Sequence, residues 1–95
     1  MPDILDELQA IIADRKRNPK DGSYTNRLFE EGPSRIAQKV GEEAVEVVVA
    51  ALTQEREQQI GEFCDLFYHA IVLMTQLDIS LYDVFAELEK RHKKS

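Results

Sequence analysis

The segment IAQKVGEEAVEVVVAAL, residues 36–52, decides the fold of this chain. Its valines lie among alanines in a long helical pattern, without the alternation of a strand. On a helix of about 3.6 residues per turn, one narrow charged stripe lies between apolar neighbours. The stripe consists of Arg35, Lys39, Glu43 and Glu46. A solvated helix face is normally broad and polar throughout, so this narrow stripe indicates a site.

A second acidic stripe lies in the next predicted helix, where Glu62, Asp65 and His69 share one side between apolar flanks. Glu43 and Glu46 are three residues apart, as are Glu62 and Asp65. That spacing places both members of a couple on one helix face. Two such helices side by side would bring four carboxylates together, which requires a cation. Hard oxygen ligands suit Mg²⁺ or Mn²⁺, so the residues predict a metal-dependent enzyme with a phosphate-rich substrate.

Other interpretations of these residues stay open. Adjacent glutamates on helices are usually solvated. Lys39 and Arg35 can neutralise the carboxylates as salt bridges, or they can bind substrate phosphates. His69 can be hydrogen-bonded within the protein instead of serving as a ligand. The second acidic couple and the apolar flanks favour metal binding.

The hydrophobic spacing predicts an all-α chain with one domain over residues 1–95. Asp3 is a plausible N-cap of the first helix, and Ser80 with Asp83 resembles a capping box before the last one. Basic residues at the end of the last helix, up to Lys94, favour its dipole. We expect helices from Ile4 to Arg17, from the Ser23-Tyr24-Thr25 segment to Gly32, from Pro33 to Leu52, from Glu55 to Leu77, and onward from Ser80 to about Lys93.

Composition narrows the possible partners. The 95 residues carry a formal net charge of −6 with no broad basic face, which argues against a nucleic-acid partner. The longest apolar run, residues 47–52, is too short to span a bilayer, and the opening Met1-Pro2-Asp3 lacks a signal-peptide pattern. The only cysteine, Cys64, is expected to pack in the core. We therefore expect a cytoplasmic protein without membrane partners.

Several motifs together resemble a known family, the phosphoribosyl-ATP pyrophosphohydrolases of histidine biosynthesis. The most specific part is the combination of Ser23-Tyr24-Thr25 with the Lys-Val-Gly-Glu-Glu run at residues 39–43. The acidic couples alone are shared with the wider MazG-like all-α nucleoside triphosphate pyrophosphatases. The resemblance covers nearly the whole chain after the first helix and continues through Leu28, Gly32, Ile36 to Glu46, Glu62, Asp65-Leu66, Tyr68-His69, Asp83-Val84, Leu88 and Arg91.

The resemblance implies Mg²⁺-dependent hydrolysis of phosphoribosyl-ATP to phosphoribosyl-AMP and pyrophosphate. It also implies a MazG-like bundle of about four to five helices, completed as a homodimer. The family's metal ligands correspond to Glu43, Glu46, Glu62 and Asp65. These four residues, together with Glu42 in a supporting role or as proton acceptor, form the expected catalytic set. The expected substrate-binding residues are Ser23, Tyr24, Thr25, Arg27, Arg35, Lys39 and His69.

The loop before residue 28 is also open to a simpler interpretation, because Ser23 and its neighbours can form an ordinary helix-capping loop. Some relatives are fused to the cyclohydrolase that acts next in the pathway, and this chain resembles the stand-alone form. One alternative function is that of a MazG-like house-cleaning pyrophosphatase for other nucleoside triphosphates. Another is a non-enzymatic helical interaction module.

Overall fold

The structure is a computed structural model that describes residues 3–93. These residues form helices and no strand, so the all-α prediction is confirmed. Two expectations rest partly on residues outside the described range. They are the lack of a signal-peptide pattern at residues 1–2 and the basic helix end at Lys94. The helices agree closely with the expected ranges and are α1 (Ile4–Arg17), α2 (Tyr24–Glu31), α3 (Pro33–Thr53), α4 (Arg56–Gln76) and α5 (Leu81–Lys93).

Short polar residues define where the helices start. The Asp3 side chain accepts a hydrogen bond from the Asp6 backbone N–H at 3.3 Å, which confirms it as the cap of α1. Before α5, the Ser80 hydroxyl accepts from the Asp83 N–H at 3.1 Å and the Asp83 carboxylate accepts from the Ser80 N–H at 2.9 Å. This reciprocal pair is the predicted capping box.

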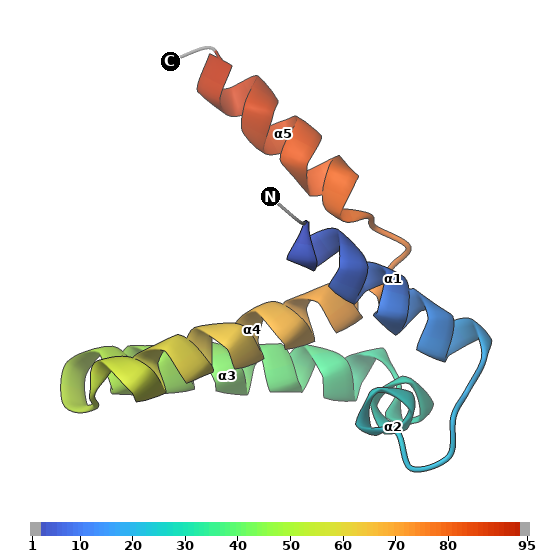
Figure 1. The fold of residues 1–95 in the computed structure, drawn as a ribbon, viewed down its shortest axis with the longest axis horizontal. Helices are drawn as coiled ribbons and strands as arrows, with labels where there is room; N and C mark the ends of the chain where they lie inside the picture. The colour runs from blue at the N-terminus through green and yellow to red at the C-terminus, as the bar shows by residue number, and fades with distance from the viewer. Residues whose placement is uncertain (1–2, 94–95) are drawn as a thin grey trace.

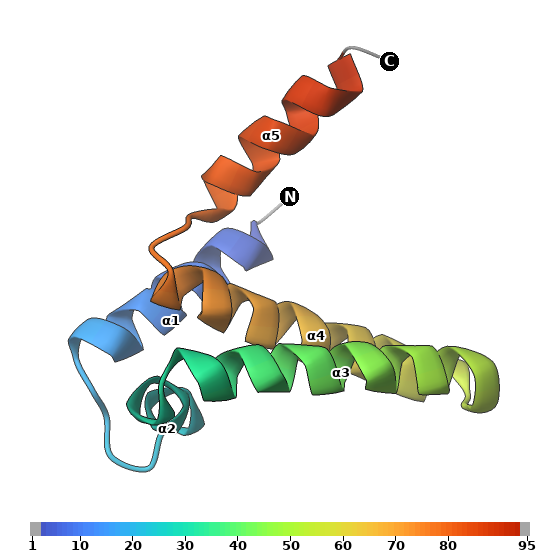
Figure 2. The ribbon, with the colours of Figure 1, turned by 180° about the vertical axis from the view of Figure 1, so that it is seen from behind.

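Helices α3 and α4 form an antiparallel hairpin, and the other helices gather at one end of it (Figure 1). Helix α1 packs across the C-terminal part of α4, and α2 lies beside the start of α3, as the reverse view also shows (Figure 2). Gly32, with a φ of 93°, makes the sharp turn between α2 and α3. Helix α5 packs mainly on α1 and then extends away from the hairpin.

The core is small, and every helix contributes to it. It lies where α1, α2 and α5 meet the hairpin. The far part of the hairpin is left without a cover, and its large apolar side chains are exposed. The buried cluster is made of Ile12, Leu28, Ile36, Ile71, Val72 and Leu81. The exposed apolar residues of the hairpin are Val45, Val48, Val49, Leu52, Ile60, Phe63 and Phe67.

Cys64 lies on this uncovered part of α4 and is exposed in the chain. The prediction that it packs in the core is therefore wrong for the folded chain. The apolar helical pattern around Cys64 is real, but no helix within residues 3–93 covers that side. Periodicity shows which residues share a face and leaves open what covers the face.

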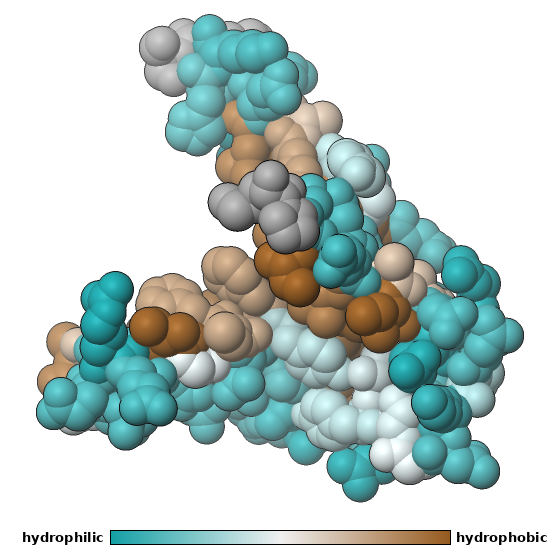
Figure 3. Space-filling view, viewed as in Figure 1, coloured by the Kyte–Doolittle hydropathy of each residue, from teal (hydrophilic) through white to brown (hydrophobic). Residues whose placement is uncertain are grey.

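The single chain is more extended than a typical domain of its mass. Its accessible surface is 6877 Å², against about 5,600 Å² expected for a folded 10.9 kDa monomer. Its radius of gyration is 14.7 Å, whereas a compact domain of this length has about 12 Å. Apolar side chains gather along the upper edge of the α3–α4 arm and on the part of α5 that rises from it (Figure 3). No helix within residues 3–93 is long and apolar enough to cross a membrane.

Two neighbouring isoleucines of α1 test where the core lies. Ile12 is 1% exposed and Ile11 is 53% exposed. Ile12→Ala should lower the free energy of unfolding by about 2–5 kcal/mol, because it leaves a cavity between packed helices. Ile11→Ala, the matched control, should cost less than about 1 kcal/mol. Urea denaturation followed by circular dichroism measures both values, and equal losses would contradict this placement of the core.

Candidate metal centre

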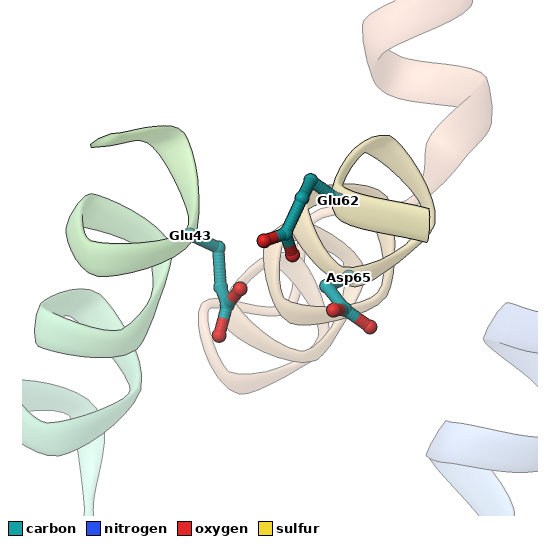
Figure 4. A group of neighbouring side chains, drawn as sticks. All are labelled: Glu43, Glu62 and Asp65. Atoms are coloured by element: carbon teal, nitrogen blue, oxygen red, sulfur yellow. The ribbon is translucent and has the colours of Figure 1, made fainter. Parts of the chain in front are cut away.

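Three carboxylates from the two hairpin helices meet in one place (Figure 4). Glu43 projects from α3, and Glu62 and Asp65 project from α4 one turn apart. Each offers one oxygen, and these oxygens all lie within 4.8 Å of one another. The antiparallel packing of α3 on α4 creates this meeting point, because it places the two predicted acidic stripes side by side.

Glu43 is the buried member of the group, with 6% of the residue exposed. Its Oε1 atom lies 3.4 Å from the Lys39 ammonium, whereas its Oε2 atom is buried and has no hydrogen-bond partner in the described protein. A buried carboxylate oxygen without a partner is costly. A hard divalent cation would satisfy that oxygen, and the all-carboxylate donor set fits such an ion.

The acidic groups also disturb one another electrostatically. Partial burial, followed by the hydrogen bond and charge of Asp65 and then the charge of Glu43, raises the pKa of Glu62. The hydrogen bond and charge of Glu43, with smaller contributions from burial and Glu62, raise the pKa of Glu46. A raised carboxyl pKa means that ionisation is opposed where these groups sit. A bound cation would remove this opposition.

The other two expected acidic residues lie around this group. Glu46 is exposed and borders Glu43, but it is not among the three residues whose oxygens converge. Glu42 is directed elsewhere: its carboxylate accepts a hydrogen bond from the Gln38 amide at 3.0 Å and lies 3.5 Å from Lys39. The Gln38 hydrogen bond and the Lys39 charge lower the pKa of Glu42.

The two basic residues of the α3 stripe form ion pairs, as one of the alternatives expected. Lys39 contacts both Glu42 and Glu43. Burial acts against its charge, but the neighbouring Tyr24 phenol and the two carboxylates outweigh burial and raise the pKa of Lys39. Arg35 lies 3.3 Å from Glu31, outside the three-carboxylate group.

The Ser-Tyr-Thr segment begins a helix, and the loop expected before residue 28 ends at Ser23. Ser23 is the N-cap of α2, and its hydroxyl accepts from the Asn26 N–H at 3.2 Å. Tyr24, Thr25 and Arg27 all belong to α2 itself. The capping interpretation therefore describes Ser23, and the following side chains lie on a helix.

The side chains of this segment reach α4. The Thr25 hydroxyl is hydrogen-bonded to the Tyr68 hydroxyl. The Tyr24 hydroxyl lies 3.0 Å from Nε2 of His69, and Arg27 lies over the Tyr24 ring, 5.6 Å from its centre. His69 is 6% exposed, and its Nδ1 atom is 2.7 Å from the Asp65 carbonyl oxygen. His69 is thus hydrogen-bonded within the protein, as one of the alternatives expected.

This arrangement coincides with a sequence match over almost the whole chain. The sequence model described as phosphoribosyl-ATP pyrophosphohydrolase matches residues 5–92. The chain belongs to this family. The resemblance of its motifs to that family is therefore confirmed.

Individual relatives in the family match nearly the whole of this chain. A phosphoribosyl-ATP pyrophosphatase of Clostridium novyi is 49% identical over 92 residues, which cover 97% of this chain and 84% of that protein. One from Metallosphaera sedula is 50% identical over 93 residues, covering 98% of this chain and 100% of that protein. A bifunctional histidine biosynthesis protein of Caldanaerobacter subterraneus is 48% identical over 97% of this chain, which corresponds to 45% of its own length.

One residue that supports the site was not singled out from the sequence. Asn26 is buried, and both the oxygen and the nitrogen of its side-chain amide are hydrogen-bonded. Its Oδ1 atom accepts from the Lys20 N–H at 2.7 Å, and its Nδ2 atom donates to the Arg15 carbonyl at 2.6 Å. Asn26 therefore ties the α1–α2 loop to α1 and sets where α2 begins. The only sequence signal was a polar residue two positions before the buried Leu28.

Repulsion within the acidic group predicts how metal-free protein responds to Glu62→Gln. The folded state holds the Glu62 proton more tightly than the unfolded chain does, because its folded pKa is raised. The stability due to this proton is present below the unfolded pKa and is lost as the pH rises through the folded pKa. In a chelator at pH 7, Glu62→Gln should therefore melt higher than the unsubstituted protein in differential scanning fluorimetry.

With Mg²⁺ present, the unsubstituted protein should instead melt higher than Glu62→Gln. At a concentration one hundred times its Kd, a ligand adds about 2.7 kcal/mol, which corresponds to about 10 °C or more for a chain of this size. The Glu62→Gln variant should gain much less. Glu57→Gln, on the exposed first turn of α4, should respond to Mg²⁺ like the unsubstituted protein. An equal Mg²⁺ response in all three proteins would contradict a role for Glu62 in holding the metal.

Proposed function

We infer that this chain hydrolyses phosphoribosyl-ATP to phosphoribosyl-AMP and pyrophosphate in histidine biosynthesis, with Mg²⁺ held by the three converging carboxylates. The family match over residues 5–92 carries the reaction and the substrate. The group formed by Glu43, Glu62 and Asp65 carries the metal assignment, since its donors are all hard oxygens and one of them is buried without a partner. Mn²⁺ has the same ligand preference and should substitute.

The acidic residues divide into four that would hold the ion, three of them converging and one at their border, and one that supports them. Glu43, Glu62 and Asp65 would be ligands, and Glu46 at the border of the group would be the fourth. When bound, the ion supplies positive charge that polarises the triphosphate and neutralises developing negative charge. Glu42 contacts Lys39 instead of the other carboxylates, so we give it a supporting role that keeps Lys39 beside Glu43.

Lys39 is the best-placed cation for the substrate phosphates. It is partly buried and borders the acidic group, with its ammonium 3.4 Å from the Glu43 carboxylate. An ammonium in such a place can contact a phosphate oxygen as a point charge. Arg27 lies on α2 and Arg35 lies in the first turn of α3, one turn before Lys39, and they remain proposed contacts for more distant parts of the substrate.

Conservative substitutions of two ligands test the assignment. Asp65→Asn and Glu43→Gln keep the shape of each side chain and remove its charge. Each should lower the rate of pyrophosphate release from phosphoribosyl-ATP by about a hundredfold or more, because the ion loses an anionic ligand. Glu57→Gln is the control and should retain full activity. Circular dichroism should show the same helix content in all variants.

The substrate panel makes this test decisive. ATP and a set of deoxynucleoside triphosphates are run beside phosphoribosyl-ATP, with and without Mg²⁺. Full activity of Asp65→Asn at limiting Mg²⁺ would contradict the ligand assignment. Preferential release from deoxynucleoside triphosphates by the unsubstituted protein would instead place the chain with the house-cleaning enzymes.

We also propose that the bundle is completed by a second copy of the chain. The chain exposes seven large apolar residues along the α3–α4 hairpin, and its accessible surface exceeds that of a typical monomer. A patch of this kind on one chain usually marks an interface. Phe67, one of these seven residues, also lines a small hollow of about 120 Å³ between α1, α4 and the start of α5. The other residues that line this hollow are Leu5, Ala70, Ile71, Met74 and Leu81.

A charge placed on the exposed apolar face should break this dimer. Light scattering should give about twice the 10.9 kDa chain mass for the unsubstituted protein. Phe63→Asp should shift the mass to that of one chain, because burying an unpaired carboxylate is strongly unfavourable. Leu77→Asp is the matched control, because Leu77 is a similarly exposed apolar residue at the C-cap of α4. A single-chain mass for the unsubstituted protein at micromolar concentration would contradict the proposal.

A further inference from the structure

A line of hydrogen bonds connects the start of α2 to the backbone of Asp65, whose carboxylate belongs to the acidic group. His69 of α4 is 6% exposed and is bonded through both ring nitrogens. Its Nδ1 atom lies 2.7 Å from the Asp65 carbonyl oxygen, and its Nε2 atom lies 3.0 Å from the Tyr24 hydroxyl. Asp65, whose carboxylate joins the acidic group, is thus in direct contact with the residue that Tyr24 binds.

The chemistry of these atoms determines which of them donates. A carbonyl oxygen can only accept, so Nδ1 of His69 carries a hydrogen and donates it to Asp65. In the neutral ring Nε2 is then an acceptor, and the Tyr24 hydroxyl donates to it. A phosphate oxygen is also an acceptor. The Tyr24 hydrogen is already used, so Tyr24 has none to donate to a substrate phosphate while this contact holds.

Helix α2 also packs against α3, the helix that supplies Glu43. Contacts between α2 and α4 continue through the next residue, because Thr25 is bonded to Tyr68 and the Tyr24 and Tyr68 rings stack at 6.3 Å. Helix α2 therefore contacts both helices that supply carboxylates.

We propose that Tyr24 and His69 are positioning residues of the metal centre, which hold α4 against α2 so that Asp65 stays at the correct separation from Glu43. The proposal rests on the proposed function, in which those carboxylates hold Mg²⁺. It replaces the substrate-binding role expected for these two residues. Ligands on two different helices keep a fixed geometry only if the helices are fixed relative to each other, and groups that orient metal ligands commonly set the metal affinity.

Tyr24→Phe is the direct test, because it removes the hydroxyl and leaves the ring that packs against Tyr68. Isothermal titration of substrate-free protein with Mg²⁺ alone should show a Kd raised by about tenfold, the lower end for residues that orient ligands. At saturating Mg²⁺, the KM for phosphoribosyl-ATP should change by less than about twofold. Tyr82→Phe is the control, because it removes a hydroxyl that donates to Asp6 at the α1–α5 contact. It should leave the Kd for Mg²⁺ and the KM unchanged.

A double substitution shows whether Tyr24 acts through His69. Adding Tyr24→Phe to His69→Gln should weaken Mg²⁺ binding no further than His69→Gln alone, because the contact is already lost. Thermal melts of each variant in chelator show that the proteins are folded. If the losses of Mg²⁺ affinity from the two single substitutions add up in the double variant, the two residues act separately. That result would overturn the proposal.

The outcomes also separate this proposal from the proposed function. A raised KM with unchanged Mg²⁺ affinity in Tyr24→Phe would show that Tyr24 touches the substrate, and it would overturn the positioning role while leaving the reaction intact. Unchanged Mg²⁺ affinity and unchanged KM would also overturn it. If the unsubstituted protein binds Mg²⁺ but releases no pyrophosphate from phosphoribosyl-ATP, the proposed reaction fails, while the comparison of Mg²⁺ affinities still decides the role of Tyr24.

Discussion

Repulsion among Glu43, Glu62 and Asp65 is the constraint on which the rest of the structure depends. Each of these three carboxylates brings an oxygen within 4.8 Å of the other two, and burial together with the charges of Asp65 and Glu43 raises the pKa of Glu62. One Glu43 oxygen is also buried without a hydrogen-bond partner among the described residues. Such a group is tolerated only where the surrounding packing holds it in place and a cation offsets its charge. The antiparallel contact between α3 and α4 provides the packing, and Lys39 offsets part of the charge.

The hairpin therefore has two opposing requirements. Its acidic side needs rigid neighbours, which α2 supplies through Tyr24, Thr25 and the loop that Asn26 anchors. Its apolar side has no neighbour within the described chain over much of its length, and α5 extends away from it. A second copy on the apolar face would stiffen the same two helices that carry the metal ligands. Assembly and metal binding are thus linked in this account through the α3–α4 hairpin.

The sequence was sufficient for the helices and for the two acidic stripes, because both follow from a local period and from capping residues such as Asp3 and Ser80. It was not sufficient for questions about which elements meet. Cys64 has the neighbours of a core residue but lies on an uncovered face. The Tyr24 hydroxyl that contacts His69 comes from another helix, and no spacing within α4 specifies it. The side-chain partners of Asn26 come from α1 and the preceding loop, and no spacing within α2 specifies them.

The most direct test of the account is to locate the ion itself. Crystals grown with Mn²⁺ and measured at a wavelength where manganese scatters anomalously would reveal its position without reference to activity. We predict the strongest anomalous peak between Glu43, Glu62 and Asp65, coordinated by oxygens from both α3 and α4. A folded protein with its manganese bound elsewhere, or with no peak among these carboxylates, would contradict metal binding by this group.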